Sequence, residues 1–173
     1  MKKLTTLFTL FLVFFSTVTG YSLEEGDEAG KFVNPDLQGK FVLSKSLIGK
    51  GWVILDFFAT DCEGCKKELP ELEELYEEFE EYEFKIIVFS VDEEGAEIVK
   101  PYFKENPTKL IVVLDRFKVA AQKYGVDEIP AVFLINPEKE IVFKRIAYSE
   151  ETVKEIRKIL ADTFIPEESE QGS

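Results

Sequence analysis

A chain of 173 residues with 45% hydrophobic content can bury one substantial core, so we expect a single domain. The 34 acidic and 21 basic residues give a formal net charge of −13, which repels a polyanionic backbone and argues against nucleic acid as a partner. Histidine is absent, which removes the usual parts of a hydrolytic triad or a histidine-based metal site.

The first 20 residues have the pattern of a secretory signal peptide. Lys2 and Lys3 precede an apolar run over positions 4–18, and small residues around Gly20 suit cleavage. This run is shorter than the roughly 20 apolar residues of a membrane-spanning helix. We therefore expect residues 1–20 to direct export to the periplasm or another extracytoplasmic compartment, with an uncleaved membrane anchor as the alternative.

Strands and helices alternate through the middle of the chain, which indicates a mixed sheet with helices on both faces. The predicted strands cover a hairpin over 32–43, then 52–58, 84–91, 110–115, 131–136 and 140–146. One predicted helix follows the cysteines, two more cover 95–106 and 117–124, and a last helix closes the domain. The domain is expected to span residues 26–164, with a disordered acidic tail over 165–173.

Local signals refine three of these helices. In the helix after the cysteines, an apolar stripe that includes Leu72 and Phe79 is expected to be buried, while Glu68 belongs to a run of glutamates expected on the other face. A kink is expected at Pro70. Gly125 suits a left-handed cap, and Ser149 is expected to cap the last helix.

The two cysteines, Cys62 and Cys65, follow a buried strand and open a helix. Two intervening residues allow the sulfurs to meet within one helical turn, and free N–H groups at the helix start stabilise a thiolate on Cys62. Cys62 is therefore the expected nucleophile and Cys65 the resolving thiol, with no cofactor beyond their own disulfide. A structural bridge would close too small a loop to add much stability. A metal would need about four ligands, which leaves only a dimeric or soft monovalent-metal site.

Residues 58–70, with the sequence FATDCEGCKKELP, resemble the active-site signature of the extracytoplasmic thioredoxins of the TlpA/ResA type, and the similarity extends over about 33–160. The resemblance implies a thioredoxin-like α/β fold, in which a mixed central β-sheet is flanked by helices. It also implies an N-terminal β-hairpin and an extra strand-helix insertion, here 90–115, before a cis-proline loop. The expected activity is thiol-disulfide oxidoreductase.

The resemblance assigns roles to further residues. Asp56 matches the buried acid beneath the resolving cysteine, where a desolvated carboxyl can take the proton of Cys65. Pro130 matches the cis-proline, which would place the Ile129 backbone beside the disulfide to pair with an extended substrate. Glu63 and Gly64 are expected to face the substrate as well.

Glu68 matches the cavity glutamate of the ResA-like branch, where it would tune the cysteines or recognise substrate. Asp61 departs from the signature, since many relatives have tryptophan there. Asp61 and Glu63 oppose thiolate formation on Cys62, and Lys66, with its neighbour Lys67, offsets them only in part. The sequence therefore predicts a reducing couple, and hence a reductase.

The expected substrate is a disulfide in an exported protein, for example apocytochrome c. The expected electron donor is a membrane thiol carrier of the CcdA or DsbD kind, and the protein itself is expected to be a monomer. Three alternatives stay open: a disulfide-forming oxidant, a peroxiredoxin-like peroxidase and a thiol-based copper or haem delivery protein. The peroxidase would need threonine or serine where Ala59 stands, and copper carriers of this fold usually add a histidine.

Overall fold

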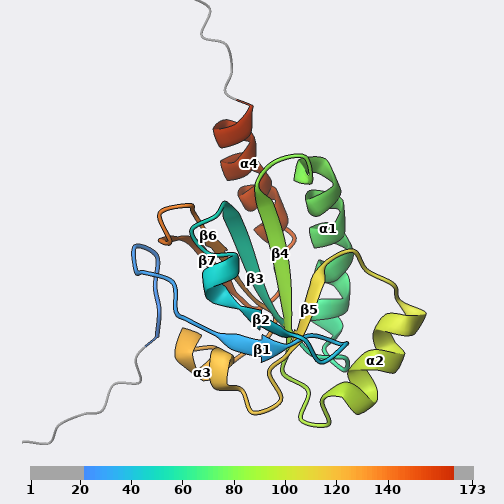
Figure 1. The fold of residues 1–173 in the computed structure, drawn as a ribbon. Helices are drawn as coiled ribbons and strands as arrows, with labels where there is room; N and C mark the ends of the chain where they lie inside the picture. Colours follow the sequence, from blue (N-terminus) through green and yellow to red (C-terminus); the bar gives the residue numbers. More distant parts are fainter. Residues whose placement is uncertain (1–21, 166–173) are drawn as a thin grey trace, which may run out of the picture.

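The computed structural model describes residues 22–165, and its centre is one mixed five-stranded sheet. The strand order is β5-β4-β3-β6-β7, in which β3, β4 and β5 run parallel while β6 and β7 are antiparallel to their neighbours (Figure 1). The strands are β3 (Trp52–Phe58), β4 (Phe84–Ser90), β5 (Ile111–Leu114), β6 (Ala131–Ile135) and β7 (Ile141–Ile146). Each lies within the range predicted for it.

The predicted hairpin forms a separate two-stranded sheet of β1 (Val33–Pro35) and β2 (Phe41–Leu43), followed by the 3-10 turn η1 (Ser44–Ser46). The Asp36 carboxylate accepts the backbone N–H groups of Gln38 and Lys40 at 2.9 and 2.8 Å. Gly39 takes φ 84°, a conformation that glycine adopts without strain. The turn chemistry therefore sets the register of the two strands.

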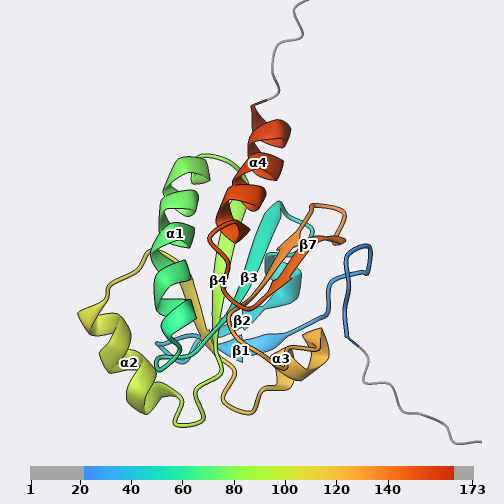
Figure 2. The ribbon, with the colours of Figure 1, turned by 180° about the vertical axis from the view of Figure 1, so that it is seen from behind.

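Helices cover both faces of the central sheet. They are α1 (Glu63–Phe79), α2 (Ala96–Glu105), α3 (Val119–Tyr124) and α4 (Thr152–Phe164). The helices α1, α2 and α4 pack on one face, where α1 and α4 run side by side, as Figure 2 shows. The other face is covered by α3 and by the hairpin segment. Within residues 22–165, no helix has both the length and the apolar character that crossing a membrane requires.

Strand β3 is buried on both faces, and its alternation separates two halves of the core. Ile54 and Phe58 point toward α1, whereas Val53, Leu55 and Phe57 point toward α3. All five side chains are 1% exposed or less. This is why the sequence of β3 is a near-continuous apolar run, and why its one charged residue is forced into the core.

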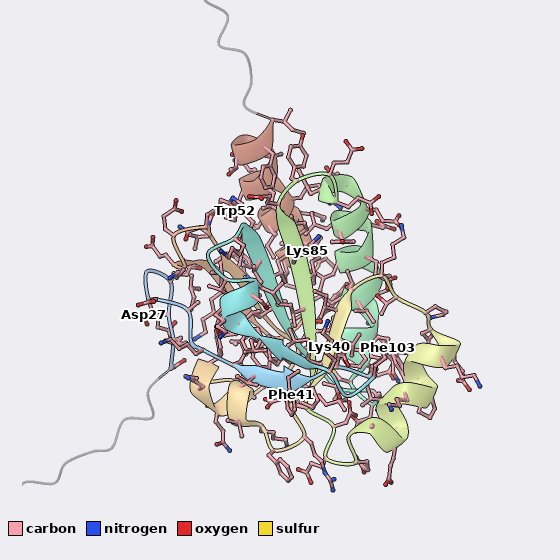
Figure 3. The ribbon with its side chains drawn as sticks, in the orientation of Figure 1. Asp27, Lys40, Phe41, Trp52, Lys85 and Phe103 are labelled. Carbon is pink, nitrogen blue, oxygen red and sulfur yellow. A yellow bond between two sulfur atoms is a disulfide. The ribbon has the colours of Figure 1, made fainter. Side chains whose placement is uncertain are left out.

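The sheet has two distinct ends. Trp52 begins β3, while Phe103 of α2 packs against Phe58, the last residue of β3, with 5.7 Å between ring centroids. Figure 3 shows Trp52 near the start of β3 and Phe103 beside α2, toward the other end of the sheet. The cysteines follow Phe58 and so lie at the Phe103 end.

Two predictions about helices were wrong. Glu68 is 1% exposed and shares one buried stripe of the helix with positions 65, 72, 75 and 79, at i+3, i+4 spacing. Ser149 does not cap α4, which begins at Thr152 after Glu151 with no side-chain cap. Instead, Ser149 forms a turn before the helix, where its backbone carbonyl accepts the Thr152 N–H at 3.0 Å. The expected signal over 1–20 and the tail beyond Ile165 lie outside the described residues.

Candidate active site

Cys62 and Cys65 lie at the junction between the end of β3 and the start of α1. Cys62 caps the amino end of α1, and its Sγ accepts the backbone N–H of Cys65 at 3.1 Å. The two cysteines form a disulfide, with Cα atoms 5.2 Å apart. Cys62 is half-buried, whereas Cys65 is 1% exposed. Cys62 is therefore the more accessible of the two cysteines.

The loop before β6 lies against the first turn of α1, at Gly64. The Ile129–Pro130 peptide bond is cis, and the Pro130 carbonyl accepts the Ala147 N–H at 2.9 Å. A Cβ at Gly64 would lie 3.1 Å from Pro130 Cδ and 3.0 Å from Tyr148 Cβ. Gly64 thus allows the close approach of α1 to this loop, and Pro130 and Gly64 meet directly.

Two carboxyl groups, one on β3 and one in α1 on the turn after Cys65, are buried in the core. Asp56 shares the α1-facing side of β3 with Ile54 and Phe58, and both Asp56 and Glu68 are 1% exposed. Within residues 22–165, neither Asp56 Oδ1 nor Glu68 Oε2 has a hydrogen-bond partner. Burial raises the pKa of Asp56 to about 7. Burial, together with the negative charge of Asp56, raises the pKa of Glu68 to about 9.

Two of the charged side chains near Cys62 form a salt bridge with each other. Lys66 Nζ lies 2.8 Å from Glu63 Oε1, a contact that lowers the pKa of Glu63 and raises the pKa of Lys66. Lys67 Nζ lies 5.7 Å from the ring centroid of Tyr148. Asp61 is exposed. Tyr148 was not predicted at this site, because it follows β7 and no local motif marks it.

Residues 26–144 match the AhpC/TSA family. The chain belongs to this family. The thiol-disulfide oxidoreductase ResA of Bacillus subtilis is 37% identical over 121 residues, which are 70% of this chain and 66% of that protein. ResA of Bacillus cereus is 34% identical over 135 residues, or 78% of this chain and 76% of the relative. The solution structure of a thiol:disulfide interchange protein from Bacteroides sp. matches with a TM-score of 0.71 at 27% identity, covering 87% and 95% of the two chains.

These findings confirm the predicted resemblance and the thioredoxin-like fold of this AhpC/TSA member, with its mixed sheet and N-terminal hairpin. The chain is a thiol-disulfide oxidoreductase whose redox-active group is the Cys62–Cys65 disulfide, as predicted. Its substrates contain disulfides.

One residue that supports the active-site loop was not predicted from the sequence. Asp92, 7% exposed, follows β4 and accepts hydrogen bonds from Thr60 N–H and Thr60 Oγ1, at 3.0 and 2.7 Å, and from Ser90 Oγ at 2.7 Å. Thr60 is two residues before Cys62. The available signal was the parallel pairing of β3 and β4, since the carboxyl ends of parallel neighbours meet at one edge of a sheet.

Replacing Asp92 with alanine should loosen the loop that carries Cys62. The change leaves one buried donor and two partly buried donors without their acceptor, which costs about 2 to 3 kcal/mol of unfolding free energy, and we expect roughly tenfold slower disulfide exchange. Urea unfolding and stopped-flow exchange with a small disulfide measure the two effects. Asp92→Asn keeps one acceptor oxygen and should fall between wild type and Asp92→Ala. Unchanged exchange in Asp92→Ala would show that Asp92 has no part in positioning Cys62.

Proposed function

We propose that this AhpC/TSA member is an exported reductase of protein disulfides. The Cys62 thiolate attacks one sulfur of a substrate disulfide, which forms a mixed disulfide and releases the other sulfur as a thiolate that takes a proton. Cys65, after losing its proton, then attacks Cys62 Sγ. The substrate leaves as a dithiol, and the Cys62–Cys65 disulfide remains for a thiol donor to reduce.

The observation that carries the direction of this reaction is that few groups beside Cys62 would stabilise a thiolate there. Cys62 Sγ accepts one hydrogen bond from the described part of the chain, that of Cys65 N–H. Lys66 pairs with Glu63, and Asp61 and Glu63 both stand beside Cys62. A poorly stabilised thiolate favours the disulfide form of the couple, which makes the dithiol a strong electron donor.

Asp56 is the group we assign to proton transfer from Cys65. A carboxyl whose pKa is near 7 is partly ionised at neutral pH and can accept a thiol proton without a large penalty. Glu68, on the turn after Cys65, holds its own proton at neutral pH because its pKa is raised to about 9. We therefore assign Glu68 to tuning and Asp56 to catalysis.

The substrate is held, in this proposal, by the edge formed by Ile129, Pro130 and Gly64. Within residues 22–165, the Ile129 N–H and C=O make no hydrogen bond, so both are free to pair with an extended substrate segment. Ile129 and Cys62 each contact both halves of the core, which supports this assignment. Glu63 is exposed at the rim of this surface.

The reduction potential of the Cys62 and Cys65 couple tests the direction. It is measured on protein that begins near residue 21, by equilibration with glutathione or dithiothreitol buffers. We expect a value at or below roughly −250 mV, typical of electron-donating couples. A value near −120 mV, typical of strong oxidants, would refute the reductase and favour the disulfide-forming alternative.

We further propose apocytochrome c as the substrate and a membrane thiol carrier as the electron donor, with this protein acting as an exported monomer. The support is the ResA name of the relatives and the signal-like pattern of residues 1–20. A disulfide-bonded peptide with the haem-attachment motif C-x-x-C-H should be reduced about tenfold faster than the same peptide with the histidine replaced. Equal rates would contradict the substrate assignment but not the reductase.

A further inference from the structure

A groove of about 590 Å³ lies between β1 and the segment that leads into α3. It opens on the sheet face opposite α1, where Figure 1 shows β1 and α3. Its apolar lining includes Val33, Phe117 and Val119, which are 60%, 78% and 66% exposed. Exposed apolar side chains that gather around one concavity often mark a binding surface. No role in the chemistry at Cys62 accounts for them.

Three cations, Lys31, Arg116 and Lys123, also line this groove. Within residues 22–165, none of the three forms a salt bridge. Lys123 Nζ donates to the Lys31 carbonyl at 2.8 Å, and the Arg116 guanidinium lies 5.6 Å from the Phe117 ring centroid. Acids outnumber bases by 34 to 21 in this chain, and these three bases line a single groove.

The acids beside the groove do not cancel these cations by direct contact. Asp115 is 2% exposed, and its carboxylate accepts the N–H groups of Ala120 and Ala121 at 3.1 and 2.8 Å. The Asn34 amide donates to Asp115 as well, at 3.2 Å. Glu93 pairs with Lys118 at 3.0 Å. The groove therefore presents apolar surface and three exposed cations to solvent, with the exposed acids Glu94 and Glu97 on either side of Gly95 and Ala96.

The groove and the disulfide lie at the same end of the sheet. Phe58, Ser90 and Leu114 are aligned across β3, β4 and β5, and each is the last residue of its strand. Neighbouring strands are about 4.8 Å apart, so the ends of β3 and β5 are separated by roughly 10 Å. Cys62 follows the first of these ends, and Arg116 follows the last. One protein partner can therefore contact both.

We propose that this groove binds an acidic, apolar segment of the protein whose disulfide reacts at Cys62. Apolar side chains of the segment cover Val33, Phe117 and Val119, and its carboxylates meet the cations of the rim. An acidic segment is repelled from most of this acidic surface, so the groove also orients the partner. The inference rests on the proposed function for the partner's disulfide, but it is independent of the direction of electron flow.

The test is direct binding of a cysteine-free probe to the oxidised protein. The probe is a fluorescein-labelled peptide in which leucine alternates with glutamate, and its counterpart has lysine in place of glutamate. At low salt, fluorescence anisotropy should show the glutamate peptide binding at least about tenfold more tightly than the lysine peptide. The double variant Arg116→Glu/Lys123→Glu should weaken that binding about tenfold or more, and Phe117→Ser should weaken it as well.

Matched controls separate the groove from general electrostatics. Lys50→Glu/Lys158→Glu makes the same change of charge at exposed positions outside the groove, and Phe41→Ser removes a 62% exposed phenylalanine that does not line it. Both controls should leave the affinity within about twofold of wild type. Equal weakening by control and groove variants would overturn the proposal, as would equal binding of the two peptides.

Two other occupants give different results. Binding of wild type to phosphatidylglycerol vesicles that is lost in Arg116→Glu/Lys123→Glu, without peptide binding, would assign the groove to a lipid surface and overturn the proposal. A dimer seen by light scattering that dissociates in Phe117→Ser would assign it to a second copy of the chain. If the peptide binds and the measured potential is that of an oxidant, the groove stands and only the proposed direction fails.

Discussion

Replacing Cys65 with serine should turn the enzyme into a trap for its substrate. Cys62 keeps its position at the start of α1 and can still attack a disulfide, but the mixed disulfide has no resolving thiol behind it. We expect steady-state reduction of a disulfide substrate to fall by at least about a thousandfold, while one equivalent of mixed disulfide accumulates per protein. Intact-protein mass spectrometry measures the adduct, and a coupled reductase assay measures the turnover.

The matched control is Cys62→Ser, which should lose turnover to the same extent and form no adduct. Cys65 is 1% exposed, so its remaining thiol is out of reach of a large disulfide. An adduct on Cys65 in the Cys62→Ser variant, with none on Cys62 in the Cys65→Ser variant, would reverse the assigned roles. A peroxidase would differ again, since hydrogen peroxide consumption would then survive in Cys65→Ser.

The second large effect concerns stability and pH. Asp56 has a pKa of about 7 in the folded protein against 3.8 ordinarily, so between pH 4 and 7 the folded state binds more protons than the unfolded state. The free energy of unfolding must therefore fall as pH rises through this window. A shift from 3.8 to about 7 corresponds to roughly 4 kcal/mol, so Asp56→Asn should gain about 2 to 4 kcal/mol above pH 7 and little at pH 4.

Urea unfolding of the oxidised protein at several pH values between 4 and 9 measures this effect. Part of the pH dependence should remain in Asp56→Asn, because burial also raises the pKa of Glu68, and that group keeps its proton to higher pH. Asp61→Asn, a change at an exposed acid, should leave stability within about 0.5 kcal/mol of wild type. A pH profile of Asp56→Asn parallel to that of wild type would contradict the assignment of Asp56 as a buried, protonated acid.

The elements of the fold were predictable because the apolar periodicity of this chain is strong. The run over 52–58 is uninterrupted save for Asp56, and it forms β3 over those same residues. The cis peptide before Pro130 was predicted from the resemblance and is confirmed. Gly125 was expected as a left-handed cap after α3, and its φ is 66°.

The features that could not be predicted depend on contacts between distant segments. Glu68 is one of many glutamates in α1, and its burial depends on what packs against that turn of the helix. Asp92 supports the active-site loop through Thr60, 32 positions earlier in the chain, and only the pairing of β3 with β4 brings them together. The groove beside α3 has β1 as its second wall, and because these segments are distant in the sequence, no local pattern predicts it.

The end of α4 lies far from the disulfide, which makes it a suitable point for attaching another molecule to this protein. Phe164 at the end of α4 lies 6.4 Å, centroid to centroid, from Trp52 at the start of β3. The seven residues of β3 separate that point from the loop that carries Cys62, a distance of roughly 20 Å along the strand. A fluorophore, tether or second enzyme joined after α4 would therefore sit at the far end of the sheet, with the disulfide and the groove left open to their partners.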